Sequence, residues 1–277
     1  MLDYKIIDKI IENSLFEDMP FGDITTDNII PDGKKANANF IAKATGILAG
    51  IDVAGRVFRN LDNNSIFTVY IEDGFAVRKG DTIAMVTGEA SAILKAERTA
   101  LNILQRMSGV ATRTNSLCKL IKGKHAKLVD TRKTTPGLRY LEKYAVSAGG
   151  GQNHRFSLSD GVLIKDNHIA AAGGIKAAVE AVRGKIPHTV KIEVEVENME
   201  MIKEAVEAKA DIIMFDNMGV GQMKEAVAFI AGRALTEASG DIDEERIIAV
   251  ADTGVDIISV GRITHSVKSL DISLKFV

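Results

Sequence analysis

The sequence predicts an α/β fold in which a TIM-like β/α barrel, closed or incomplete, follows an N-terminal α+β sandwich domain. In the second half of the chain, short apolar runs alternate with helical patterns, which predicts right-handed βαβ units and a parallel sheet. Each of these runs ends in charged or small polar residues, where the strands of a barrel line the active site. In the first third, β-rich runs and amphipathic helical segments are separated by turn residues.

Length and composition exclude several classes of protein. The chain has 277 residues, enough for one large domain or two of roughly 150 residues. Its net charge of -2 argues against a nucleic-acid binder, and its single cysteine, Cys118, excludes an intrachain disulfide and metal sites built on Cys pairs. The N-terminus does not resemble a signal peptide, and no segment approaches the ~20 apolar residues of a membrane span. We therefore expect a cytoplasmic protein with neither nucleic acid nor membrane as a partner.

The N-terminal region is predicted to be a mixed domain covering residues 1–105. An amphipathic helix runs from Leu2 to Leu15, and a second helix at 51–61 separates β-rich segments at 36–50 and 65–87. A long helical pattern then covers 92–122 and is weakened at Ser108–Gly109. We place the domain boundary inside this helix, so that the barrel covers residues 106–267, and a C-terminal strand at about 268–277 could join the first domain.

The barrel is predicted from six apolar runs and from the residues that end them. The runs lie at 127–130, 161–165, 190–195, 211–216, 234–238 and 256–260. They lead into Thr131-Arg132-Lys133, Lys165-Asp166, Glu195, Asp216-Asn217, Ser239-Gly240 and Gly261. A doubly wound open sheet would bind ligands mainly at its switch point, so six polar strand ends favour the barrel.

Charge is segregated within this half. Residues 124–166 contain eight Lys and Arg against four Asp and Glu, whereas residues 193–216 contain eight acidic residues and two lysines. If both segments reach one barrel mouth, the site has a cationic side and a carboxylate side. Several of the glutamates are expected on a solvated helix face, but Glu195 and Asp216 each end a strongly apolar strand and are candidates for function.

The cationic segment contains three motifs. In D-T-R-K-T-T-P-G-L-R (130–139), Arg132 and Lys133 suit a carboxylate and a phosphate, although a solvated turn would have the same composition. The glycines of G-G-G-Q-N-H-R (149–155) allow close backbone approach, but the string is not a P-loop. In L-I-K-D-N-H (163–168), Lys165 could form a Schiff base, bind an anion or pair with Asp166, and a lone His168 is more often structural.

The last two strands are followed by small residues. Ser239-Gly240 and Ser259-Val260-Gly261 lie where barrels commonly bind phosphate through backbone N–H groups.

Taken together, these motifs resemble the quinolinate phosphoribosyltransferase family. The strings T-T-P-G-L-R, G-G-G-Q-N-H-R, L-I-K-D-N-H, E-V-E-V and E-A-S-G are similar to that family, as are F-G-D-I-T-T (21–26), G-I-L-A-G (46–50) and A-E-R-T-A-L-N (96–102). The resemblance implies transfer of phosphoribosyl from phosphoribosyl pyrophosphate to quinolinate, with decarboxylation, giving nicotinate mononucleotide, pyrophosphate and CO₂ in NAD biosynthesis. It also implies a requirement for Mg²⁺, whose direct protein ligands are left open.

The family's roles fall on matching positions of this chain. The resemblance implies that the quinolinate carboxylates are held by Arg132, His154, Arg155 and Lys165, and that Lys133 and Thr134 assist at the phosphates. Glu195 and Asp216 would face the ribose and its Mg²⁺-bound pyrophosphate. The 5′-phosphate would be bound by Ser239, Gly240, Ser259, Val260 and Gly261. Lys133, Lys165, Glu195 and Asp216 would be catalytic. Arg98 would reach the neighbouring subunit's site, because the family forms dimers in which the N-terminal domain caps a partner's barrel.

The chain departs from the family pattern in three places. Ser157 and Asp241 stand where the family commonly has glycine, and Arg262 stands where a small residue is usual. Asp241 and Arg262 lie beside the expected phosphate loop, so the phosphate contacts are the part of the site that these departures affect.

Three other functions are weighed against this one. A relative associated with molybdenum transport shares the fold but tends to lose the K-D-N-H string. A Schiff-base aldolase would use Lys165 as nucleophile, but that lysine would need an apolar pocket and here has Asp166 and several cations beside it. The segment V-R-K-G-D-T-I-A-M-V (77–86) resembles a biotinyl or lipoyl carrier hairpin, without the expected lysine beside methionine at the turn.

Overall fold

The structure is a computed structural model, and it describes residues 2–277. The chain divides into two compact units. Unit 1 comprises residues 1–115, 134–150 and 263–277, and unit 2 comprises residues 116–133 and 151–262. Within the part of the chain described, no helix is both long and apolar enough to span a bilayer.

Unit 1 contains an antiparallel sheet to which the two ends of the chain contribute. Its strands follow the order β12-β1-β5-β3, formed by Ile272–Phe276, Lys35–Ala42, Thr82–Glu89 and Ile66–Val69. A small second ladder pairs β2 (Gly46–Ile47) with β4 (Ala76–Val77). In β1 the buried residues alternate along the strand, as expected for a strand with one covered face.

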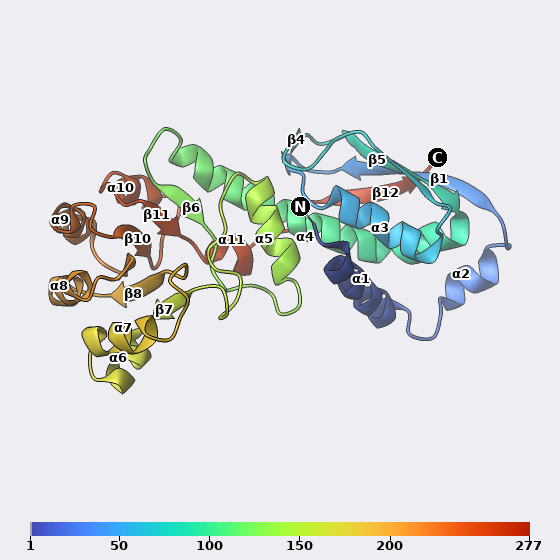
Figure 1. The fold of residues 1–277 in the computed structure, drawn as a ribbon. Coiled ribbons are helices and arrows are strands. Elements are labelled where there is room, and N and C mark those ends of the chain that lie inside the picture. Colours follow the sequence, from blue (N-terminus) through green and yellow to red (C-terminus); the bar gives the residue numbers. More distant parts are fainter. Residues whose placement is uncertain (1) are drawn as a thin grey trace. The chain divides into compact units, whose positions relative to one another are not determined.

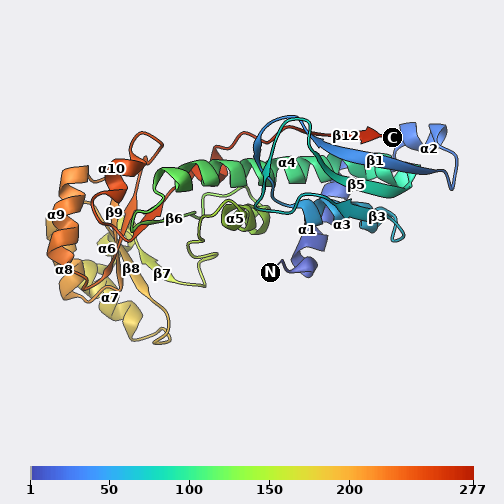
Figure 2. The same cartoon turned by 90° about the horizontal axis from the view of Figure 1, so that it is seen from above.

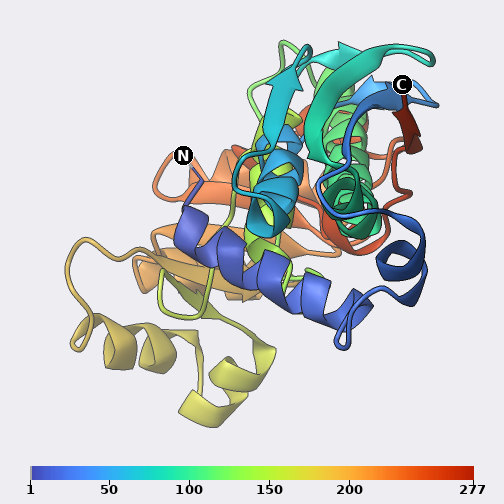
Figure 3. The ribbon, with the colours of Figure 1, turned by 90° about the vertical axis from the view of Figure 1, so that its right-hand side faces the viewer.

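Helices cover one side of this sheet (Figure 1). They are α1 (Tyr4–Asp18), α3 (Ile51–Leu61) and the first part of α4 (Ala90–Leu120). The helices α2 (Ile24–Ile29) and α5 (Arg139–Ala148) also belong to unit 1. Figure 3 shows α1 and α3, in dark blue and cyan, side by side. The rings of Phe40, Phe58 and Phe67 pack with centroids 5.6–5.9 Å apart and join β1, α3 and β3 in one core.

The long helix α4 is continuous across Ser108–Gly109, where the sequence predicts a weakening. Ser108 turns its hydroxyl to the backbone carbonyl of Ala49 at 3.2 Å. A Cβ on Gly109 would lie 2.5 Å from the Lys268 carbonyl oxygen, so glycine permits a close backbone approach there. The two residues that disfavour a helix are retained for packing, and tertiary contacts outweigh their low propensity.

Unit 2 contains a six-stranded parallel sheet with the order β6-β11-β10-β9-β8-β7. Its strands are Lys127–Val129, Ile257–Ser259, Leu235–Ser239, Ile212–Asp216, Ile192–Val196 and Val162–Ile164. Each of the six apolar runs in the sequence therefore contains a strand, and the predicted α/β architecture is confirmed. Among the described residues β6 and β7 are the two ends of the strand order, so the sheet is not closed into a complete barrel; beyond β6 only an isolated bridge joins Val129 to Gln152.

The helices of unit 2 follow the strands and lie along the outer face of the sheet (Figure 2). They are α6 (Asp166–Ala172), α7 (Ile175–Arg183), α8 (Met199–Glu207), α9 (Val220–Ile230) and α10 (Ile247–Ala251). α11 (Arg262–His265) follows the last strand, and all of it except Arg262 belongs to unit 1. Because every strand pair is parallel, all six carboxyl ends meet at one edge.

Candidate active site

The register of the parallel sheet brings polar side chains together on one face. Glu195 of β8 and Glu237 of β10 are both paired with Met214 of β9. Two residues closer to the carboxyl edge, Asp216 of β9 is paired with Ser239 of β10. Residues paired across neighbouring strands point to the same face. The sheet thus presents two successive polar rows on the face away from its helices.

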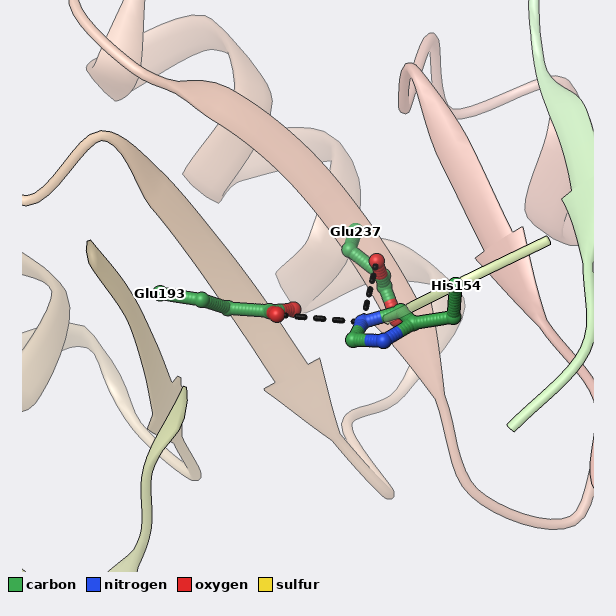
Figure 4. Close-up of side chains that lie close together, drawn as sticks. All are labelled: His154, Glu193 and Glu237. Atoms are coloured by element: carbon green, nitrogen blue, oxygen red, sulfur yellow. Dashed lines mark ion pairs between the residues drawn. The ribbon is translucent and has the colours of Figure 1, made fainter. Parts of the chain in front are cut away.

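Two carboxyl groups and one imidazole form a buried cluster in this face (Figure 4). His154 Nε2 lies 3.0 Å from a carboxylate oxygen of Glu193 and 3.6 Å from one of Glu237. The side chains of Glu193 and Glu237 are only 5% and 1% exposed, so the cluster is shielded from solvent.

The hydrogen bonds define the tautomer of His154. The backbone N–H of Arg155 donates to His154 Nδ1 at 2.8 Å, so Nδ1 is the nitrogen without a proton. Nε2 therefore has the proton and donates it toward Glu193. Both ring nitrogens of His154 are thus engaged, and its own backbone N–H donates to the buried Asp130 at 2.8 Å.

Two carboxyl groups this close cannot both be ionised. Burial, followed by the nearby charge of Glu193, raises the pKa of Glu237 from 4.5 to about 8. At neutral pH Glu237 is accordingly a carboxylic acid.

The cluster also has the composition of a metal site, because one ligand atom from each of His154, Glu193 and Glu237 lies within 4.8 Å of the others. A bound cation would require both Nε2 and Glu237 to lose their protons. Mg²⁺ prefers oxygen ligands and retains water, so an imidazole in a dry pocket does not suit it. The partly buried carboxyl groups of Glu195 and Asp216 offer only oxygen ligands and suit Mg²⁺ better.

Cations lie beside this cluster. Arg155 donates through Nη1 to the Gly161 carbonyl at 2.9 Å, which fixes its guanidinium over the loop before β7. Burial and then the neighbouring Arg132 guanidinium lower the pKa of Arg155, so the two positive groups repel each other. An anion placed between them would relieve that repulsion.

Lys165 and Glu195 form an ion pair at the end of neighbouring strands. The side chain of Lys165 is 46% exposed and that of Glu195 is 15% exposed, so the pair lies at the surface of the site. The sequence offers Asp166 as the ion-pair partner of Lys165, and the structure shows Glu195 as a partner. Asp216 instead accepts from the Asn217 amide at 3.1 Å. The ring of His168 has a structural role, because its Nδ1 accepts from the Lys165 backbone N–H at 3.0 Å and caps α6.

The loop after β10 has a backbone that only glycine permits at its first position. Gly240 has φ 93°, and a Cβ there would lie 2.1 Å from Asn217 Oδ1. Arg246 donates to the carbonyls of Gly240 and Met218 and so fastens the loops after β10 and β9 together. After β11, the Val260 N–H donates to the Val129 carbonyl at 3.0 Å.

Lys133, Thr134 and Arg98 are also predicted site residues. Lys133 is exposed and its backbone N–H is bound by the Thr131 hydroxyl. Thr134 belongs to unit 1, where its hydroxyl accepts from Arg139 Nε at 2.9 Å. Arg98 lies on α4 in unit 1 and is exposed. Their roles stay predictions.

Comparison with known proteins identifies the family. Residues 23–108 match the N-terminal domain and residues 110–275 the C-terminal domain of quinolinate phosphoribosyl transferase. A curated Bacillus subtilis protein described as a probable nicotinate-nucleotide pyrophosphorylase [carboxylating] is 46% identical, with 96% of this chain and 92% of the relative covered. The chain belongs to the quinolinate phosphoribosyltransferase family.

Solved structures agree with this assignment. NadC from Streptococcus pyogenes superposes with a TM-score of 0.95 at 40% identity, covering 100% of this chain and 99% of that one. The nicotinate-nucleotide pyrophosphorylase from Francisella tularensis gives 0.95 at 42% identity, covering 100% and 98%.

Sequence reasoning for this quinolinate phosphoribosyltransferase family member did not single out three buried acids. They are Asp130, Glu193 and Glu237, whose residues are 0%, 3% and 1% exposed. A signal for the two glutamates was present, because each lies within a predicted strand two residues before a predicted site residue. A buried carboxyl needs a partner, and the structure shows that this partner is His154.

Proposed function

We propose that this protein transfers the phosphoribosyl group of phosphoribosyl pyrophosphate to quinolinate, with decarboxylation, to give nicotinate mononucleotide, pyrophosphate and CO₂. The observation that supports this most directly is the mutual repulsion of Arg132 and Arg155 on a face that also presents the Lys165–Glu195 pair and Asp216. A planar dicarboxylate relieves the repulsion of two guanidiniums, and Arg binds carboxylate through two parallel hydrogen bonds.

The cationic residues of the site bind quinolinate, and the site's carboxylates serve the ribosyl substrate. Arg132, Arg155 and Lys165 bind the two carboxylates of quinolinate and set the orientation of its ring. His154 Nδ1 accepts from the Arg155 backbone N–H at 2.8 Å and Nε2 contacts Glu193, so the loop that presents Arg155 is held in place. Lys165 is released from Glu195 when a carboxylate arrives, which leaves Glu195 free to face the ribose.

The carboxyl groups of Glu195 and Asp216 serve the second substrate. Departure of pyrophosphate leaves positive charge on the ribosyl carbon, and carboxylates on one side of the ring stabilise that charge. Ser239, Gly240 and the Ser259–Gly261 loop bind the 5′-phosphate through backbone N–H groups and hydroxyls. Lys133 and Thr134 assist at the phosphates.

Mg²⁺ would neutralise the pyrophosphate as it leaves, and Glu195 and Asp216 would hold it, directly or through water. These two groups offer only oxygen ligands, which Mg²⁺ prefers, whereas the buried cluster would offer it the imidazole nitrogen of His154.

We also infer that the active protein is a homodimer or a larger assembly in which Arg98 completes the neighbouring subunit's site. Arg98 is an exposed arginine of α4 that forms no hydrogen bond or ion pair among residues 2–277, so its guanidinium is available to an external anion.

A Schiff-base aldolase is less consistent with the geometry. Lys165 pairs with Glu195 at a half-exposed position, whereas a nucleophilic lysine needs an apolar pocket.

The test is an assay of the purified protein with quinolinate, phosphoribosyl pyrophosphate and Mg²⁺, in which pyrophosphate and CO₂ are measured together. We expect equal amounts of both products, each dependent on quinolinate. Release of pyrophosphate without CO₂, or activity with a monocarboxylate in place of quinolinate, would contradict the proposal.

A further inference from the structure

An ion pair connects the two loops that follow β10 and β11. Arg262 Nη2 lies 3.2 Å from Asp241 Oδ1. β10 and β11 are parallel neighbours, paired through Glu237–Ile257 and Ala238–Ile258, so both loops lie at the carboxyl edge of the sheet. This is the edge where the proposed 5′-phosphate site lies.

Asp241 occupies a backbone conformation that favours glycine. Its φ is 44°, in the left-handed region, directly after Gly240. Aspartate is tolerated there better than most residues, but a β-carbon still costs conformational energy. A strained residue with an exposed charged side chain, at the rim of a ligand site, suggests a role for that charge.

The pair is not needed to hold the loop in place. Arg246 already binds the carbonyls of Gly240 and Met218, and the Asp243 carboxylate accepts from the backbone N–H groups of Glu245 and Arg246. The Asp241 and Arg262 side chains are 79% and 47% exposed, and a pair this exposed contributes little to stability.

Arg262 has donors to spare. Its single hydrogen bond among the described residues is the one to Asp241, which uses one of the five N–H groups of a guanidinium. Arg246, the arginine that follows β10, is committed to two carbonyls. Of these two arginines, Arg262 is therefore the one that can bind an incoming anion.

We propose that Arg262 is an additional binding residue for the 5′-phosphate of the ribosyl substrate, and that Asp241 is an internal anion which the phosphate displaces from it. The inference rests on the proposed function of the site. In the empty site Asp241 keeps Arg262 over the loop. When phosphate binds, the guanidinium exchanges one long contact for two parallel hydrogen bonds to a dianion, and Asp241 turns to solvent.

The proposal gives the two partners opposite effects on phosphate affinity. Arg262→Ala removes an attractive charge and leaves Asp241 to repel the phosphate, so affinity should fall roughly 10-fold or more. Asp241→Asn removes both the competitor and the repulsion, so affinity should rise about 2- to 5-fold. In the Arg262→Ala background, Asp241→Asn should give a larger gain, because the carboxylate is then uncompensated.

The experiment measures the dissociation constant of ribose 5-phosphate by calorimetry for the full-length wild type, the two single variants and the double variant. The KM for phosphoribosyl pyrophosphate is measured in parallel. Arg183→Ala is the control, because Arg183 pairs with Asp211 at the same 3.2 Å and its side chain is 44% exposed against 47% for Arg262, but Asp211 precedes β9 at the opposite edge of the sheet.

The expected result is opposite shifts for Arg262→Ala and Asp241→Asn, no shift for Arg183→Ala and weaker differences as salt is raised. If the pair only braces the loop, both single variants weaken binding and the double variant is no worse than either, and the proposal is overturned. Unchanged binding in all variants overturns it as well. Because binding of ribose 5-phosphate needs neither quinolinate nor turnover, the proposed function can fail in the product assay while this inference is still decided.

Discussion

At the scale of single residues, one backbone hydrogen bond determines which nitrogen of His154 has the proton in the buried cluster. The Arg155 N–H donates to His154 Nδ1, so the imidazole proton lies on Nε2 and faces Glu193 at 3.0 Å. Glu193 is then the hydrogen-bond acceptor, and Glu237 retains its proton. Protonation of Glu237 and the hydrogen bonds of His154 explain how three titratable groups fit in a buried site.

Glu237→Gln is expected to flatten the pH dependence of stability. The pKa of Glu237 is about 8 in the folded protein and 4.5 in its ordinary range. Between these values the folded state binds one proton more than the unfolded state, so this group's contribution to stability is complete below pH 4.5 and is lost as the pH rises through about 8. Glutamine is uncharged at every pH and removes that loss.

The measurement is the melting temperature at about pH 6 and about pH 8, with Glu200→Gln on the exposed face of α8 as the control. The drop between the two pH values should be smaller for Glu237→Gln than for wild type and unchanged for the control. Parallel pH profiles for Glu237→Gln and wild type would show that another group holds the proton.

Arg155→Ala and Lys165→Ala are each expected to weaken quinolinate binding. Loss of one charge-assisted contact to a carboxylate should cost about 1.5–3 kcal/mol, or roughly 10- to 150-fold in affinity. Quinolinate titrations followed by calorimetry test this, with Arg233→Ala as a control because Arg233 binds the Ile230 carbonyl after α9. Wild-type affinity in both variants would remove these residues from the dicarboxylate site.

At the scale of elements, the pattern of the sequence predicted the strands of unit 2 because each is a short apolar run with a polar end. The site was predictable where a polar residue ended such a run, as at Lys165 and Asp216. Glu193 and Glu237 were not found, because a residue inside a strand reveals its partner only through the register, and register depends on pairing between distant segments. The continuity of α4 at Gly109 also depends on such a contact.

Arg106→Ala tests how far one side chain of α4 stabilises unit 1. Arg106 forms hydrogen bonds to Glu142 at 2.8 and 3.0 Å and to the Thr264 carbonyl at 2.6 Å, and the Glu142 side chain is 1% exposed. Removing Arg106 leaves a buried carboxylate without its cation, so we expect a loss of about 3–5 kcal/mol in the free energy of unfolding.

Urea denaturation followed by circular dichroism measures this loss. Arg56→Ala is the matched control in the same unit, since the Arg56–Asp8 pair is half-exposed, with both side chains 32% accessible, and should contribute no more than about 1 kcal/mol. Equal losses in the two variants would mean that burial of Glu142 does not decide the energy.

At the scale of the whole molecule, the predicted site residues come from both units. Most of them belong to unit 2, whereas Thr134 and Arg98 belong to unit 1. The order of strands and helices within each unit could be predicted from periodicity. The assembly of subunits could not, because it depends on surfaces whose complementarity is not expressed in any local pattern.

Complementation between inactive variants tests whether Arg98 acts in the neighbouring subunit. Arg98→Ala and Lys165→Ala should each reduce turnover strongly, because each removes a cation from every site of a homodimer. In a mixed dimer with Arg98 supplied by the partner, one of the two sites contains both changes and the other contains neither. After subunits are exchanged at equal concentrations, about half of the dimers are mixed and each has one intact site, so about a quarter of wild-type activity should return. If mass spectrometry shows mixed dimers and no activity returns, Arg98 acts within its own subunit, since each site of a mixed dimer would then lack one of the two cations.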